Sequence, residues 1–81
     1  MLPQLENIAT STANENGYEM CGVHLHTHLV PMTIQVQIRH QQGEDVALDD
    51  CALFSKPMEE ALYTSQLFNE PSVLEIRNTA L

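Results

Sequence analysis

The fold of this chain is decided by residues 18–39, which read YEMCGVHLHTHLVPMTIQVQIR. In residues 32–39 apolar and polar side chains alternate at every position, and this period of two predicts a β-strand with one buried face. Residues 18–28 predict a second strand by the same rule, because their apolar positions alternate at Cys21, Val23 and Leu25. Pro31 predicts the turn between the strands, since proline cannot donate to a β-ladder.

Helical periodicity flanks this pair of strands. Residues 3–16 predict a helix that ends at Gly17, because glycine adopts the left-handed conformation without steric cost. Its apolar face comprises Leu2, Leu5, Ile8, Ala9 and Ala13. Leu48-Asp49-Asp50-Cys51 predicts the start of a second helix, since carboxylates favour the positive end of the helix dipole. The face expected to be buried comprises Cys51, Phe54, Met58, Ala61 and Leu62.

A third strand is predicted over residues 73–76, and a kink at Pro57 in the second helix. The element order is therefore α-β-β-α-β. This order predicts an α+β fold in which two helices cover one face of a three-stranded sheet and leave the other face open.

Charge and composition narrow the classes of function. Lys and Arg total 3 against 11 Asp and Glu, which gives a net charge of −8 at pH 7. This balance argues against a protein that binds nucleic-acid phosphates by itself, because each phosphate contact needs a cation. Any partner of the chain is expected to be basic. The sequence shows neither an apolar run of the roughly 20 residues that span a bilayer nor a secretion signal. We expect a cytoplasmic protein without membrane contact.

No set of side chains predicts catalysis or a bound cofactor. Cys21 and Cys51 are too far apart for a redox CxxC motif, and both lie in apolar patterns that predict burial. Cys51 lies near a predicted helix N-terminus, which leaves open a thiol of lowered pKa. The adjacent carboxylates Glu59 and Glu60 point in different directions from a helix and make a poor acid–base pair. We interpret the chain as a non-enzyme without cofactor.

Three histidines at alternate positions are the most conspicuous polar feature. On a strand they point to the open face, beside polar residues of the next strand. The residues expected to contact a partner there are His24, His26, His28, Gln35, Gln37 and Arg39. A His-x-His pair also leaves open a zinc site at His24 and His26. The next strand offers glutamine and arginine rather than further ligands, so no metal site is expected.

Four short motifs follow one another along the chain. They are Gly17-Tyr18-Glu19-Met20, Gly43-Glu44-Asp45, Leu48-Asp49-Asp50-Cys51-Ala52 and Val73-Leu74-Glu75-Ile76. In order and spacing these motifs resemble the N-terminal domain of the bacterial ribosome maturation factor RimP family, which usually carries a serine at the position of Ser55. The resemblance extends over residues 2–76. It implies a ribosome maturation factor that assists assembly of the small (30S) ribosomal subunit without catalysis or cofactor.

The resemblance also implies a partner and a domain organisation. The partner is the immature small subunit or one of its basic ribosomal proteins, and direct binding of nucleic acid is expected to be weak or indirect. Residues 1–76 correspond to the N-terminal domain and residues 77–81 to a divergent tail, without the family's Ser-Ser-Pro-Gly-like linker and barrel-like second domain. A fragment, a truncated paralogue and a gene with an altered 3′ end all fit this ending.

Two alternative functions stay open at this point. One is a KH-like RNA-binding domain, which has a comparable α/β arrangement. The other is a small metal-binding protein that uses His24 and His26. The sequence leaves the strand order and the oligomeric state undetermined.

Overall fold

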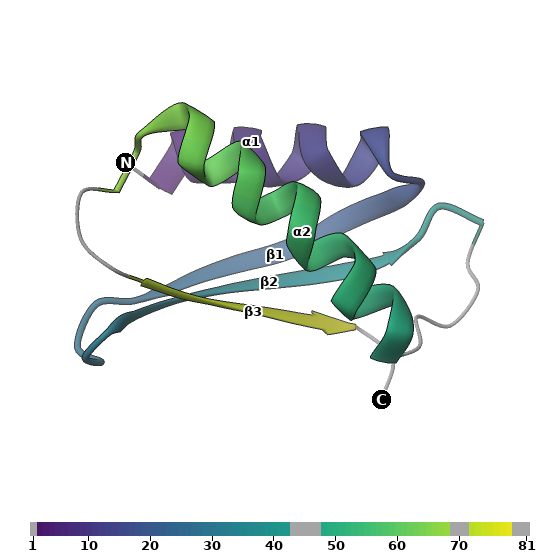
Figure 1. Cartoon of the computed structure of the whole chain (residues 1–81). Helices are drawn as coiled ribbons and strands as arrows, with labels where there is room; N and C mark the ends of the chain where they lie inside the picture. Colours follow the sequence, from purple (N-terminus) through teal and green to yellow (C-terminus); the bar gives the residue numbers. More distant parts are fainter. Residues whose placement is uncertain (1, 43–47, 69–71, 79–81) are drawn as a thin grey trace.

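The computed structural model describes residues 2–42, 48–68 and 72–78 of the 81-residue chain (Figure 1). The elements follow the predicted order and confirm the α+β class. They are α1 (Leu2–Glu15), β1 (Tyr18–His26), β2 (Met32–His40), α2 (Leu48–Ser65) and β3 (Ser72–Asn78). Neither helix of the described part combines the length and the apolarity that crossing a membrane requires.

The three strands form one sheet in the order β1-β2-β3. β1 and β2 are antiparallel, as a short turn between them requires, whereas β3 is parallel to β2. A parallel pair needs a crossover connection of a dozen or more residues, and α2 lies in that connection. The central position of β2 explains why its inward residues Ile34, Val36 and Ile38 are at most 1% exposed.

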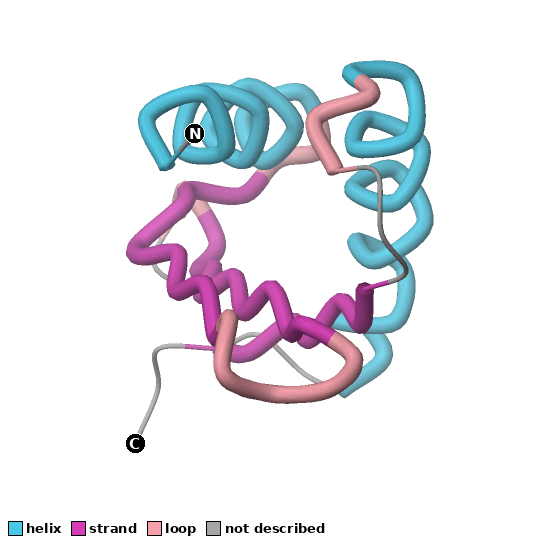
Figure 2. Tube along the Cα trace, turned by 90° about the vertical axis from the view of Figure 1, so that its left-hand side faces the viewer, coloured by secondary structure: helices cyan, strands magenta, loops and turns pink. Residues whose placement is uncertain are grey.

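Both helices cover the same face of the sheet. Viewed along the strands, the sheet curves and the helices lie on its concave side (Figure 2). α1 contributes Leu5, Ala9 and Ala13 to the core, and α2 contributes Phe54 and Met58. The two alanines have small side chains, which allows α1 to approach the sheet closely. Removal of this apolar surface from water is the main source of stability.

The outer residues of the predicted α2 face are less buried than its centre. Phe54 and Met58 are fully buried, as predicted. Cys51, Ala61 and Leu62 are half-buried at the margins of this face. α2 continues through Pro57 as one helix, and the kink expected there stays a prediction.

The burial predicted for Cys21 is wrong. Cys21 is exposed, because a β-bulge between Met20 and Gly22 shifts the register of β1 against β2. Tyr18 packs into the core before the bulge and Val23 packs against it after the bulge. The extra residue changes which positions point inward, so the alternation that grouped Cys21 with Val23 does not extend through it.

The ends of the elements follow the predictions within two residues. Gly17 has a φ of 84° and turns the chain from α1 into β1, in the left-handed conformation predicted for it. β1 ends at His26 rather than at His28, because the chain turns toward β2 there.

Candidate functional site

The face of the sheet opposite the helices carries most of the residues predicted to contact a partner. His24 and His26 come from β1, and Gln35, Gln37 and Arg39 come from β2. We call this surface the sheet face. It comprises Glu19, His24, His26, Thr33, Gln35, Gln37, Arg39, Val73, Glu75 and Arg77. His28 lies beyond the end of β1, beside the sheet face rather than on it.

The register of β3 adds two charged residues that the sequence did not place. Glu75 pairs with Gln35, and Arg77 pairs with Gln37. Gln35 Nε2 donates to Glu75 Oε1 at 3.2 Å, and Arg77 Nε donates to the same oxygen. The Arg77 guanidinium, and after it Gln35, lowers the pKa of Glu75.

A second ion pair lies at the other edge of the sheet face. Arg39 Nη2 lies 2.8 Å from Glu19 Oε1, across the β1–β2 pair. The hydrogen bond to Glu19 raises the pKa of Arg39. Each arginine of the sheet face therefore has a glutamate beside it, and this surface is close to neutral although the chain is strongly acidic.

The imidazole rings form a row at one end of the sheet face. The ring centroids of His24 and His26 are 6.4 Å apart, and those of His26 and His28 are 5.9 Å apart. The described residues contain no group of three or more His, Cys, Asp or Glu placed to hold a metal ion. The row offers polar rings for hydrogen bonding and stacking.

A hydrogen-bonded corner, which sequence reasoning missed, joins three elements. Tyr18 Oη donates to Asp50 Oδ1 at 3.0 Å, and His40 Nε2 lies 3.3 Å from Asp50 Oδ2. The rings of Tyr18 and His40 are 4.9 Å apart, and Phe54 packs edge-on against Tyr18. These contacts fasten the first turn of α2 to the paired ends of β1 and β2.

Burial and the Asp50 carboxylate raise the pKa of two groups at this corner, Tyr18 and Cys51. Burial, and after it the hydrogen bond to Asp50, raises the pKa of Tyr18. Burial also raises the pKa of the Cys51 thiol, with a smaller effect of Asp50 in the same direction. The raised value argues against the reactive thiol that the position of Cys51 near a helix N-terminus left open.

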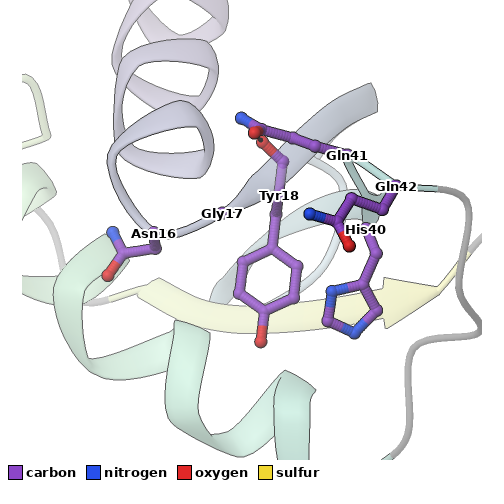
Figure 3. Close-up of a pocket in the computed structure, with 6 residues that line it drawn as sticks. All are labelled: Asn16, Gly17, Tyr18, His40, Gln41 and Gln42. Atoms are coloured by element: carbon purple, nitrogen blue, oxygen red, sulfur yellow. Dashed lines mark hydrogen bonds between the residues drawn. The ribbon is translucent and has the colours of Figure 1, made fainter.

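A shallow pocket of about 280 Å³ opens beside this corner (Figure 3). Its lining residues are Asn16, Gly17, Tyr18, His40, Gln41 and Gln42. Two hydrogen bonds hold Gln41 at this pocket: its side chain donates to the Tyr18 carbonyl oxygen at 3.2 Å, and its backbone N–H donates to the Gly17 carbonyl oxygen. The Tyr18 phenol and the His40 imidazole both interact with Asp50, and three of the other lining residues, Asn16, Gln41 and Gln42, carry amide side chains.

One signal in the sequence could have pointed to this corner. Tyr18 begins the first strand and His40 ends the second, so a hairpin brings them together in general terms. His26 pairs with Thr33 next to the turn. If the pairing continued from there without a bulge, Tyr18 would lie opposite Gln41 instead of His40. The unpredicted bulge therefore also concealed the Tyr18–His40 contact.

Comparison with known proteins gives one consistent result. The sequence model of the RimP N-terminal domain matches residues 8–77. The ribosome maturation factor RimP of Prochlorococcus marinus (strain MIT 9303) is 57% identical over all 81 residues, which are 53% of its own length. The protein of the same name from Parasynechococcus marenigrum (strain WH8102) is 51% identical over all 81 residues, which are 52% of its length. The chain thus spans about half the length of these curated relatives. It belongs to the RimP N-terminal domain family.

Proposed function

We propose that this chain takes part in ribosome maturation as a non-catalytic binding domain that assists assembly of the small (30S) subunit. The observation that carries the proposal is 57% identity, over the whole chain, to a relative named ribosome maturation factor RimP. Residues 1–76 form the binding domain in this proposal. The same likeness favours ribosome maturation over the KH-like and metal-binding alternatives.

The partner that we propose is the immature small subunit or one of its basic proteins. Binding takes place in the cytoplasm in this proposal. The net charge of −8 supports a basic partner, because an acidic chain attracts a basic protein and associates with it faster. The same negative charge repels the phosphates of bare RNA. Contact with RNA in this proposal is weak or indirect.

The state of the Cys51 thiol agrees with binding without catalysis. The contacts of Asp50 with the Tyr18 hydroxyl and the His40 ring hold the first turn of α2 to the sheet. The thiol of Cys51 has a raised pKa, which keeps it protonated at neutral pH.

The contact residues that we propose lie on and beside the sheet face: His24, His26, His28, Gln35, Gln37 and Arg39. This surface supports recognition through hydrogen bonds, since it presents amides and imidazoles and little net charge. Protein interfaces typically contain about one hydrogen bond per 100–200 Å², so such a surface suits a polar contact.

Co-sedimentation of the purified chain with free small subunits, large subunits and whole ribosomes tests this function. We expect selective pelleting with free small subunits. The variant His24→Ala/Gln37→Ala should weaken it about tenfold, the loss expected at the centre of an interface. Gln4→Ala/Asn7→Ala, on the exposed side of α1, is the matched control and should pellet like the natural chain. A folded chain that does not pellet, or that pellets equally with large subunits, would contradict the proposal.

A further inference from the structure

The solvent-facing side of α2 exposes large side chains that the fold does not use. Leu53 is 69% exposed and Tyr63 is 87% exposed. Lys56 and Glu60 lie between them at spacings of three and four residues, so the four residues share one stripe. We call this surface the α2 outer face; it comprises Asp49, Leu53, Lys56, Glu59, Glu60 and Tyr63.

The charge of the α2 outer face differs from that of the sheet face. It carries three exposed carboxylates, at Asp49, Glu59 and Glu60, against the single ammonium group of Lys56. On the sheet face two glutamates are balanced by two arginines. Within the described residues, the excess negative charge of the chain therefore lies mainly on the helices.

The opposite side of α2 holds this surface in place. Phe54 and Met58 are fully buried against the sheet, and Asp50 bonds the first turn to Tyr18. A rigid surface loses little conformational freedom when a partner binds, which favours its use in recognition.

We propose that the α2 outer face is a second interaction surface, separate from the sheet face, and that it binds an Arg- and Lys-rich segment of a protein. The inference rests on the proposed function in one respect: that function identifies the source of the segment as a basic protein of the small subunit. The carboxylates pair with its cations, the Tyr63 ring stacks on a guanidinium group, and Leu53 contacts an apolar side chain.

The length of the stripe sets the length of the bound segment. Leu53 and Tyr63 are ten residues apart, which is about 15 Å along a helix axis. An extended chain covers that distance with about five residues. RNA does not suit this surface, because its phosphates would meet carboxylates.

Fluorescence anisotropy with a labelled peptide of alternating Arg and Ser, about 12 residues long, tests the inference directly. We expect Glu59→Gln/Glu60→Gln to weaken binding about 5- to 10-fold at low salt, and Tyr63→Ala about 3- to 10-fold. The matched control is Glu6→Gln/Glu15→Gln, which removes two exposed carboxylates from α1 and should change affinity less than about twofold.

The outcomes separate a defined surface from general attraction. Equal weakening by the α1 and α2 double variants would mean that only net charge matters, and would overturn the inference. Binding that is insensitive to Tyr63→Ala would also overturn it, because the high exposure of Tyr63 leaves the fold of that variant intact.

Co-sedimentation of the same variants distinguishes this inference from the proposed function. Natural chain and α2 variants that pellet equally with small subunits would overturn the second surface and leave the proposed function standing. Failure of the natural chain to pellet, together with site-specific peptide binding, would support the surface and contradict the function in subunit assembly.

Discussion

Neighbouring residues of β2 point to opposite sides of the sheet and meet opposite environments. Ile34, Val36 and Ile38 are buried beneath the helices, whereas Gln35 and Gln37 face solvent on the sheet face. On the covered side each side chain touches residues far away in the sequence. On the sheet face Gln35 bonds Glu75 and Arg39 pairs with Glu19, in each case across to the adjacent strand.

The covered side therefore holds the fold, while the sheet face is available for recognition. A substitution on the covered side leaves a cavity whose cost adds to the lost burial. A substitution on the sheet face changes hydrogen bonds and ion pairs that water can replace.

The largest effect is expected from Phe54→Ala. Its ring is fully buried and packs against Tyr18, so its loss should cost about 3–5 kcal/mol. This approaches the whole stability of a domain of this size, on the order of 5 kcal/mol. Urea unfolding followed by circular dichroism measures it, with the exposed neighbour Leu53→Ala as control, expected within about 0.5 kcal/mol of the natural chain. Similar losses in both variants would contradict the division into two environments.

A smaller loss is expected where the covered side meets the start of α2. Tyr18→Phe removes the hydrogen bond to Asp50 and keeps the ring, which should cost about 1–2 kcal/mol. Thermal unfolding at neutral pH measures the loss. Tyr63→Phe, an identical change on a ring that is 87% exposed, should leave the melting temperature unchanged. The Tyr18–Asp50 bond contributes nothing if the two variants melt together.

Alkaline pH should lower the free energy of unfolding, through the ionisation of Cys51 and Tyr18 at the same corner. The folded state raises the pKa of both Cys51 and Tyr18, so the unfolded chain releases these protons first and is favoured as pH rises. The loss should begin near pH 8.5 for the thiol and near pH 10 for the phenol, about the ordinary pKa values of these groups. Urea titrations from pH 7 to 11 measure the free energy of unfolding. Above pH 10 this free energy should fall less in Tyr18→Phe than in the natural chain. Equal falls in the two proteins would show that the Tyr18 phenol is not the cause.

The smallest effect is expected on the sheet face. The pKa of Glu75 is lowered by Arg77 and Gln35, so its contribution is present above the ordinary glutamate pKa and is lost as pH falls through the lowered value. Glu75→Gln should leave the melting temperature at pH 7 almost unchanged and reduce its fall between pH 5 and 3. High salt should diminish the difference between the two proteins, because the ion pair is exposed. A large loss at pH 7 would show that the sheet face supports the fold.

Local patterns made much of the fold predictable. The alternation in residues 32–39 predicts which side chains of β2 point inward, because the period of two belongs to the strand itself. Gly17 marks the end of α1 for an equally local reason. Cys21 was misplaced because it continues the apolar row of Val23 and Leu25, whereas the bulge moves the inward row of β1 to Tyr18 and Met20.

The candidate site was predicted in part for the same reason. His24, His26, Gln35, Gln37 and Arg39 share the sheet face because strand alternation places them there. The charged residues of β3 were missed as members of this face, since no local pattern shows which strand lies beside β2. The Tyr18–Asp50–His40 corner escaped notice because it joins three elements through contacts between residues up to 32 positions apart.

Three properties of this protein follow from the sequence alone: the elements, the acidic charge of the chain and the likeness to the RimP family. These properties depend on composition, on motifs and on periods of two or 3.6 residues, which are all local. Packing in three dimensions adds the parallel placement of β3, the bulge, the corner at Asp50 and the separation of a neutral sheet face from acidic helices. These features arise when distant segments pack into one core, where strand order and register are chosen by the fit of side chains from every element at once.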